Sequence, residues 1–179
     1  MKKQSNLLFV LIIAIIFLSQ PILLAQDSLK YSVEDARATI EKFSAADETV
    51  AELFKTAHGY AVFPSIGKAG IGVGGAGGKG VVFENGKAIG GSNMSQVSIG
   101  LQLGGQKYSE VIFFETESAL NTFISDKYTF AAQISAVAIA SGESADAKYE
   151  EGVLVFTMPL GGLMFEASVG GQNFKFHPF

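Results

Sequence analysis

Residues 67–84 read GKAGIGVGGAGGKGVVFE, and eight of these eighteen residues are glycine. Every even position from 70 to 80 is Gly or Ala, a period of two that is typical of an extended strand with one face stripped of side chains. Because glycine weakens a strand interior, another backbone or a ligand is expected to approach this face closely. We expect a neighbouring strand there, with any ligand site at its edge. The glycines are Gly67, Gly70, Gly72, Gly74, Gly75, Gly77, Gly78 and Gly80.

The stretch also contains GVGGAG at residues 72–77, which formally matches the dinucleotide fingerprint GxGxxG. That fingerprint requires a following helix, whose N-terminus holds the pyrophosphate. Here residues 79–84 run directly into Asn85-Gly86, a strong hairpin signal, so a strand follows. A phosphate loop is excluded as well, because Gly80 stands where Ser or Thr is required.

Helices are predicted on the N-terminal side of the glycine stretch. Ser32 has the character of an N-cap, with acids in the next turn, and Asp47 can cap a second helix that Gly59 would end. Both helices are amphipathic, so we expect their apolar faces to cover the sheet that follows. A third, short helix is predicted after Thr116.

The rest of the chain reads as short strands. Residues 96–104 alternate, with Val97, Ile99, Leu101 and Leu103 on one face, which is typical of a half-buried antiparallel strand. Further strands are predicted at residues 60–63, 111–114, 128–130, 133–140, 152–158 and 163–169, with a polar loop at residues 141–151. The predicted class is α+β: N-terminal amphipathic helices packed on a strongly curved or barrel-like, mainly antiparallel, glycine-rich sheet.

The chain begins with Met1-Lys2-Lys3, followed by twelve apolar residues and a polar break. This pattern predicts a secretory signal peptide over residues 1–26 and a single domain over residues 27–179. The alternative is an uncleaved anchor, for which twelve apolar residues are short. The expected location is outside the cytoplasm, either periplasmic or secreted, or peripheral on a membrane.

Charge and composition exclude several classes of function. Without Lys2 and Lys3 the chain carries 11 basic and 17 acidic residues, a net charge of −6, which argues against nucleic-acid binding. The absence of cysteine excludes disulfides and thiolate metal sites. The two histidines, His58 and His177, lack the spacing of a zinc site, and no nucleophile elbow is present. We therefore predict no catalytic residues, metal or cofactor, and a protein that is not an enzyme.

Several motifs together resemble the SYLF-domain family. The first is GYAVFPSIGKAGIGVGGAGGKG at residues 59–80. It is followed by GLQLG at residues 100–104, VIFF at residues 111–114, the helix near residues 119–123, GGLMF at residues 161–165 and VGG at residues 169–171. The resemblance spans roughly residues 33–172.

This resemblance implies a lipid-binding module, since eukaryotic relatives bind phosphoinositide membranes and fungal members also bind actin. Lys68 matches a basic residue of the family, whereas Ala76 replaces a second one, which removes part of the basis for phosphoinositide specificity. Exported bacterial members are stand-alone domains behind a signal peptide, which is the arrangement here. Actin is an unlikely partner for such a member.

The leading hypothesis is thus an exported, non-catalytic protein that binds lipid or a membrane surface. Lys68, Lys79 and Lys87 are the candidate residues for contact with a headgroup, the last two only because they lie near the glycine run. The alternative is a structural protein of the cell envelope or a small outer-membrane barrel, with which the alternation at residues 97–103 and the C-terminal Phe179 are compatible.

Overall fold

The computed structural model describes residues 31–125, 129–130, 137–138 and 147–179. The expected signal peptide, residues 1–26, lies outside the described residues, as does much of the predicted strand 133–140 and loop 141–151. The α+β class is confirmed. The elements in chain order are α3 (Val33–Ala46), α4 (Glu48–Thr56), β1 (Gly59–Glu84), β2 (Lys87–Phe114), α5 (Glu117–Ile124), β3 (Thr129–Phe130), β4 (Val137–Ala138) and β5 (Val153–Pro178).

The sheet is mainly antiparallel and open. Its order is β1-β2-β5-β3, and β4 pairs with β5 in parallel. Among the described strands, β1 and β3 stand at opposite ends of this order, so the sheet is not closed. The expectation of a barrel-like sheet is therefore wrong as regards closure. The physical reason is that β1 bends back on itself instead of pairing with the opposite edge.

Three very long strands replace the many short ones that were predicted. β1, β2 and β5 contain 26, 28 and 26 residues. Pro64 and Pro159 were expected to end strands, but each lies at a register irregularity within one. Bulges can accommodate proline, which lacks a ladder N–H. The predicted Asn85-Gly86 turn between β1 and β2 is confirmed, with φ angles of 47° and 77°.

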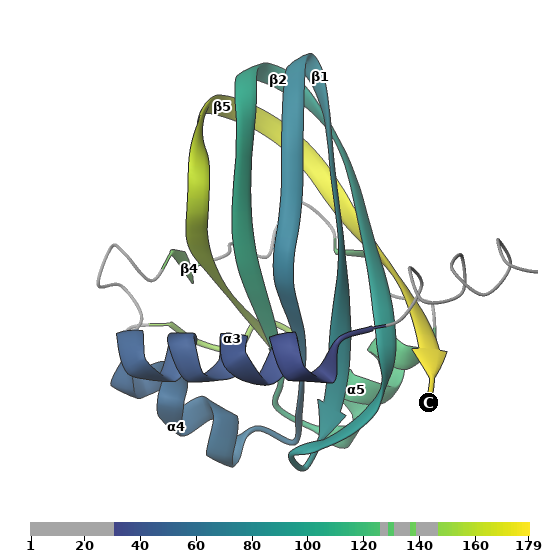
Figure 1. The fold of residues 1–179 in the computed structure, drawn as a ribbon. Coiled ribbons are helices and arrows are strands. Elements are labelled where there is room, and N and C mark those ends of the chain that lie inside the picture. The colour runs from purple at the N-terminus through teal and green to yellow at the C-terminus, as the bar shows by residue number, and fades with distance from the viewer. Residues whose placement is uncertain (1–30, 126–128, 131–136, 139–146) are drawn as a thin grey trace, which may run out of the picture. The chain divides into compact units, whose positions relative to one another are not determined.

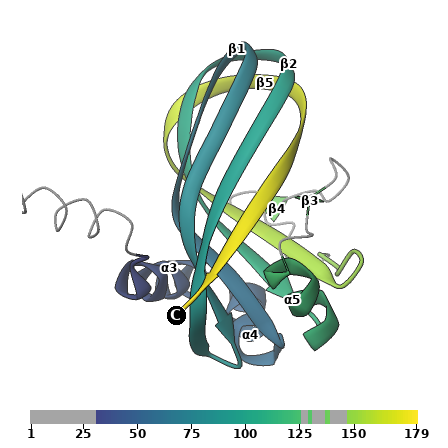
Figure 2. The same ribbon diagram turned by 90° about the vertical axis from the view of Figure 1, so that its right-hand side faces the viewer.

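All three long strands turn over midway, so that each has two limbs (Figures 1 and 2). In β1 the register shifts at Gly72, whose φ is 71°, a conformation that favours glycine. Gly100 and Gly104 of β2, opposite this point, also have positive φ angles. We call the parts of β1 before and after Gly72 its first and second limbs. At their far ends the limbs meet again, where the Asn85 N–H donates to the carbonyl oxygen of His58 at 3.0 Å.

Two apolar cores lie near these far ends. The first core packs Ala36, Phe43 and Val50 of α3 and α4 against the sheet, where the rings of Tyr60 and Phe83 from the two limbs stack at 5.1 Å. Figure 1 shows α3 and α4 at this end of the strands, away from the bend.

The second core lies between the limbs. Leu120 and Phe123 of α5 close it, and Phe63 of the first limb and Phe174 of β5 pack with their rings 5.5 Å apart. The two cores thus hold the limbs together at the ends far from the bend. Other residues line the region nearer the bend.

The helices begin at polar caps. The side chain of Ser32 accepts from the N–H of Asp35, and Asp47 accepts from Thr49 and Val50. The prediction that Gly59 ends α4 is wrong, because the helix stops at Thr56 and Gly59 begins β1. None of the described helices has the length and hydrophobicity that crossing a membrane requires.

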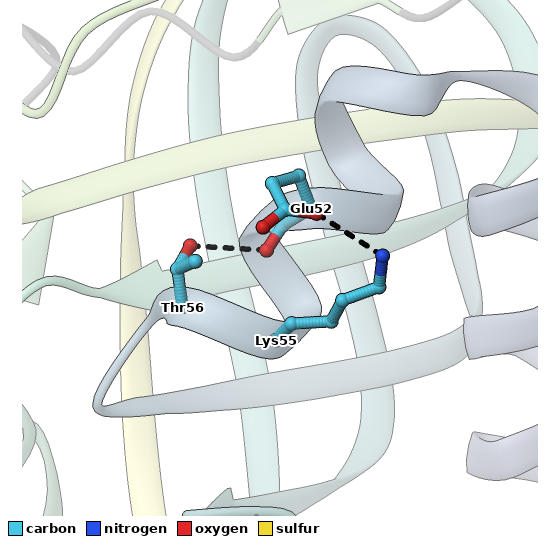
Figure 3. Close-up of polar contacts among 3 residues, drawn as sticks. All are labelled: Glu52, Lys55 and Thr56. Atoms are coloured by element: carbon cyan, nitrogen blue, oxygen red, sulfur yellow. Dashed lines mark hydrogen bonds and ion pairs between the residues drawn. The ribbon is translucent and has the colours of Figure 1, made fainter.

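On the exposed side of α4, Lys55 forms an ion pair with Glu52 at 3.0 Å, and the Thr56 hydroxyl donates to the Glu52 carbonyl oxygen (Figure 3). Both charged side chains are mostly exposed to solvent. Such a pair contributes little to stability.

Candidate functional site

The bare face of the glycine stretch turns inward, toward the other limb. A Cβ added to Gly80 would lie 2.6 Å from the carbonyl oxygen of Val62, and one added to Gly78 would lie 2.9 Å from that of Ser65. Real side chains do not tolerate such distances from backbone, so only glycine lets the two limbs approach so closely. The expectation that a neighbouring strand meets the bare face is confirmed at these two positions, and the neighbour is the same strand.

Nearer the bend the limbs separate and leave a pocket of about 790 Å³. Both limbs of β1 contribute, together with β2 and Gly161 of β5. The lining residues are Gly67, Lys68, Ala69, Gly75, Ala76, Gly77, Gly105, Gln106, Lys107 and Gly161. We call this space the glycine pocket. A methyl group could be added at Gly67, Gly75 or Gly77 without a close clash. At these three positions glycine therefore borders open space and does not face a closely packed backbone.

A second pocket of about 370 Å³ has a different lining. Polar side chains from both sides of the bent sheet surround it. They are Lys68, Gln96, Gln106, Tyr108, Glu110, Thr157 and Gln172, with Pro159 completing the wall. We call it the polar pocket. It shares Lys68 and Gln106 with the glycine pocket, so the two spaces adjoin.

Glu110 is the most buried residue of the polar pocket, with 1% of its surface exposed. Its Oε2 accepts a hydrogen bond from Nε2 of Gln172 at 3.0 Å. Its Oε1 is buried and has no hydrogen-bond partner among the described residues. Burial raises the pKa of Glu110 to about 7, while the Gln172 hydrogen bond and the charge of Lys68 act in the opposite direction.

Sequence reasoning did not identify Glu110. The available signal was a single acid directly before the apolar run at residues 111–114. Keeping an unpaired acid on the inward face of a buried strand costs free energy. An acid in such a position is therefore a candidate functional residue. The sequence alone gave no indication that Gln172, 62 residues later, would face it.

The outer face of the bend carries an exposed apolar patch. Ile71 lies opposite Leu103, Val73 opposite Ile99, and Gly75 opposite Val97. Directly opposed residues of an antiparallel pair share a face of the sheet. The exposed fractions of these five apolar side chains lie between 61% and 80%. We call Ile71, Val73, Val97, Ile99 and Leu103 the apolar patch.

This patch corrects the interpretation of residues 96–104 as an ordinary half-buried strand. In such a strand the apolar face packs on the core and the polar face meets water. Here Val97 and Ile99 are exposed, whereas Ser98 between them is buried. The reason is the bend, which turns the polar face toward the other limb and leaves nothing on the apolar one within the described residues.

The three candidate lysines lie in different places. Lys68 lines both pockets. Lys79 is exposed on the second limb opposite Asn93, and Lys87 begins β2 at the hairpin, opposite Glu84. Lys87 lies far from the bend, because its partner Glu84 is twelve residues from Gly72, roughly 40 Å along an extended strand. Of the three candidates, only Lys68 is among the residues that line these two pockets. Lys107, which was not predicted, also lines the glycine pocket.

The histidines have ordinary polar neighbours. Nε2 of His58 lies 3.2 Å from Glu84 Oε1, and Nε2 of His177 lies 3.2 Å from Nδ2 of Asn93. Within the part of the chain that the structure describes, no group of three or more His, Asp or Glu side chains could hold a metal ion.

Comparison with known protein families gives one match. Residues 95–177 match the family Ysc84, described as "Las17-binding protein actin regulator". This confirms the resemblance to the SYLF-domain family, a family of binding domains. The match covers β2 from Ser95 onward and nearly all of β5, and the glycine stretch precedes it. No curated protein matches the chain.

Proposed function

We propose that this protein, whose residues 95–177 match the Ysc84 family, is a non-catalytic module that docks on a lipid surface through the apolar patch. The observation that carries this proposal is the exposure of five aliphatic side chains on one face of the bend. Contiguous exposed apolar patches mark sites of interaction with proteins or membranes. The sequence pattern of residues 1–26 supports an exported protein that acts outside the cytoplasm.

The chemistry of the patch favours lipid over a protein partner. Its members are Ile, Val and Leu only, whereas binding energy at protein interfaces is concentrated in Trp, Tyr and Arg. Short aliphatic side chains on an outward bend suit insertion between lipid headgroups, where apolar burial contributes about 25 cal/mol per Å². An actin partner, which the family description suggests, is disfavoured by the expected export.

Electrostatic attraction has a secondary role in this proposal. The chain from residue 27 onward carries a net charge of −6, which opposes long-range attraction to anionic lipid. No basic residue belongs to the patch itself. We therefore expect binding that depends on apolar insertion and needs no particular anionic headgroup. This also removes the reason to assign phosphoinositide specificity.

Vesicle flotation tests the proposal. The chain from residue 27 onward contains all described elements and is expected to float with phosphatidylcholine vesicles. Ile99→Asn should abolish flotation. Phe179→Asn is a matched control, because Phe179 is equally exposed, at 65%, but lies outside the patch.

Failure of the unsubstituted chain to float with any vesicle, neutral or anionic, would reject lipid docking. Equal loss of flotation in Ile99→Asn and Phe179→Asn would show that the patch is not the docking surface. Circular dichroism of each variant establishes that the fold is retained.

A further inference from the structure

We propose that the polar pocket between the two limbs binds a neutral, hydroxyl-rich group, a polyol or a sugar, either free in solution or as the headgroup of a lipid. This site is distinct from the apolar patch, which faces outward at the bend, whereas the polar pocket faces inward. The inference therefore does not depend on membrane docking.

Glu110 has one carboxyl oxygen left unsatisfied by the described residues. Its Oε1 is buried and lacks a partner among the described residues, although Oε2 is held by Gln172. Because a buried polar atom without a partner is unfavourable and Glu110 lines the polar pocket, a ligand group that enters beside this residue and hydrogen-bonds to it would be stabilised.

The polar pocket is open to the surface and has the size of a ligand site. Six of the other residues of the polar pocket are half-buried and Pro159 is exposed, so the pocket reaches the surface with Glu110 at its most buried point. Its 370 Å³ falls within the range of about 300–1,000 Å³ that is typical of ligand sites. At roughly 30 Å³ per water this is the space of about a dozen waters, far more than one bridging water fills.

The lining of the polar pocket is rich in hydrogen-bond donors and acceptors. Gln96, Gln106 and Gln172 each carry an amide, which has both an acceptor oxygen and a donor NH₂. Tyr108 and Thr157 add hydroxyl groups, which also donate and accept. A ligand hydroxyl has the same dual character, so several hydroxyls on one ligand match a wall of this composition.

The polar pocket contains charged groups of both signs. The pocket holds one acid, Glu110, and one base, Lys68, close enough for the lysine to affect the carboxyl group. Above about pH 7, where Glu110 is ionised, the carboxylate would repel a phosphate, and the lysine would repel an ammonium or metal cation. Neither sign of charge is favoured, and a neutral ligand avoids both conflicts.

The experiment is titration of the ¹⁵N-labelled chain, residues 27–179, with D-glucose, glycerol, inorganic phosphate and choline, followed by amide chemical shifts. We expect saturable shifts with glucose or glycerol, centred on Gln106, Glu110 and Gln172. Gln172→Ala and Glu110→Ala should each weaken this binding at least tenfold. Glu115→Gln, an exposed acid on the same stretch of chain, is the matched control and should bind normally.

A separate arm identifies the source of the hydroxyls. Vesicles of phosphatidylcholine with a glucosyl-diacylglycerol should retain the Ile99→Asn variant if a lipid headgroup enters the pocket, and release it if only free sugar binds. Retention supports the site by itself, and release supports it only together with saturable shifts for free glucose or glycerol. The proposed site is rejected if neither glucose nor glycerol gives saturable shifts and the glycolipid vesicles do not retain the variant. Binding of phosphate or choline in place of the sugar also rejects it. Sugar binding by a chain that floats with no vesicle would reject the docking function alone.

Discussion

Nε2 of Gln172 donates to Oε2 of Glu110 at 3.0 Å, and this bond joins two parts of the sheet that pair with opposite limbs of β1. Glu110 lies opposite Phe63 on the first limb, whereas Gln172 lies opposite Gln96, which itself pairs with Ala76 on the second. The hydrogen bond therefore crosses the interior of the bend. Around it the sheet is polar inside and apolar outside, whereas at the far ends of the limbs an apolar core packs on each face.

Glu110 should make the stability of the protein depend on pH. Its pKa is raised to about 7 in the folded state from 4.5, chiefly by burial, so the folded chain holds a proton there that the unfolded chain releases. Stability from this group is complete below pH 4.5 and is lost as the pH rises to about 7. Glu110→Gln should remove this loss, with a gain above pH 7 of roughly 3 kcal/mol.

Urea denaturation between pH 4 and pH 8 measures this effect. Glu115→Gln, an exposed acid, serves as the control and should keep the pH profile of the unsubstituted chain. An unchanged pH profile in Glu110→Gln would contradict the assignment of the buried carboxyl group as its cause.

The close approach of the limbs can be tested with two glycines of β1. Gly80→Ala should destabilise the fold by about 1–3 kcal/mol, because its methyl group would overlap the carbonyl oxygen of Val62. Gly67→Ala is the matched control, since no atom lies within 4 Å of its added methyl group. Thermal unfolding of both variants provides the comparison. Equal melting temperatures would mean that the limbs do not approach as described.

Lys87 should not contribute to lipid binding. Lys87 lies at the hairpin, far from the apolar patch, so Lys87→Gln should leave flotation with neutral vesicles unchanged. Because the proposed binding is apolar, raising the salt concentration should also have little effect, since salt screens only charge interactions. Flotation across a salt series measures both. A steep loss of binding with salt, or with Lys87→Gln, would indicate electrostatic docking instead.

Helix α4 allows a comparison between a cap and a surface ion pair. Asp47→Ala removes the side chain that accepts from the N–H groups of Thr49 and Val50 and should cost about 0.5–2 kcal/mol. Lys55→Ala removes only the exposed pair with Glu52 and should change stability by less than about 1 kcal/mol. Chemical denaturation distinguishes the two. A larger loss in Lys55→Ala than in Asp47→Ala would reverse this ranking.

Local features were predictable because neighbouring residues determine them. Ser32 and Asp47 satisfy the N–H groups next to them in the chain, and Asn85-Gly86 adopts the positive φ angles of a tight turn. Strand ends were not predictable in this way. Pro64 and Pro159 indicate breaks in isolation, but the long strands β1 and β5 accommodate them at bulges.

The candidate site was predictable only in part. The glycine stretch correctly indicated a close approach of backbone. Lys68 was predicted as a contact for a lipid headgroup; it lines the open space that remains, and its role stays a prediction. Glu110 and Gln172 were missed because their significance depends on each other. Nothing within a few residues of either one in the chain reports their contact.

By itself, the sequence determined that the glycine stretch is strand, that an Asn-Gly hairpin follows it, and that capped helices precede it, since each depends on contacts within a few residues. The tertiary structure decided which face of each strand meets water. Alternation distinguishes two faces, but burial depends on what covers them. Here the bend places Gly80 against Val62, directs Glu110 inward and leaves Ile99 exposed.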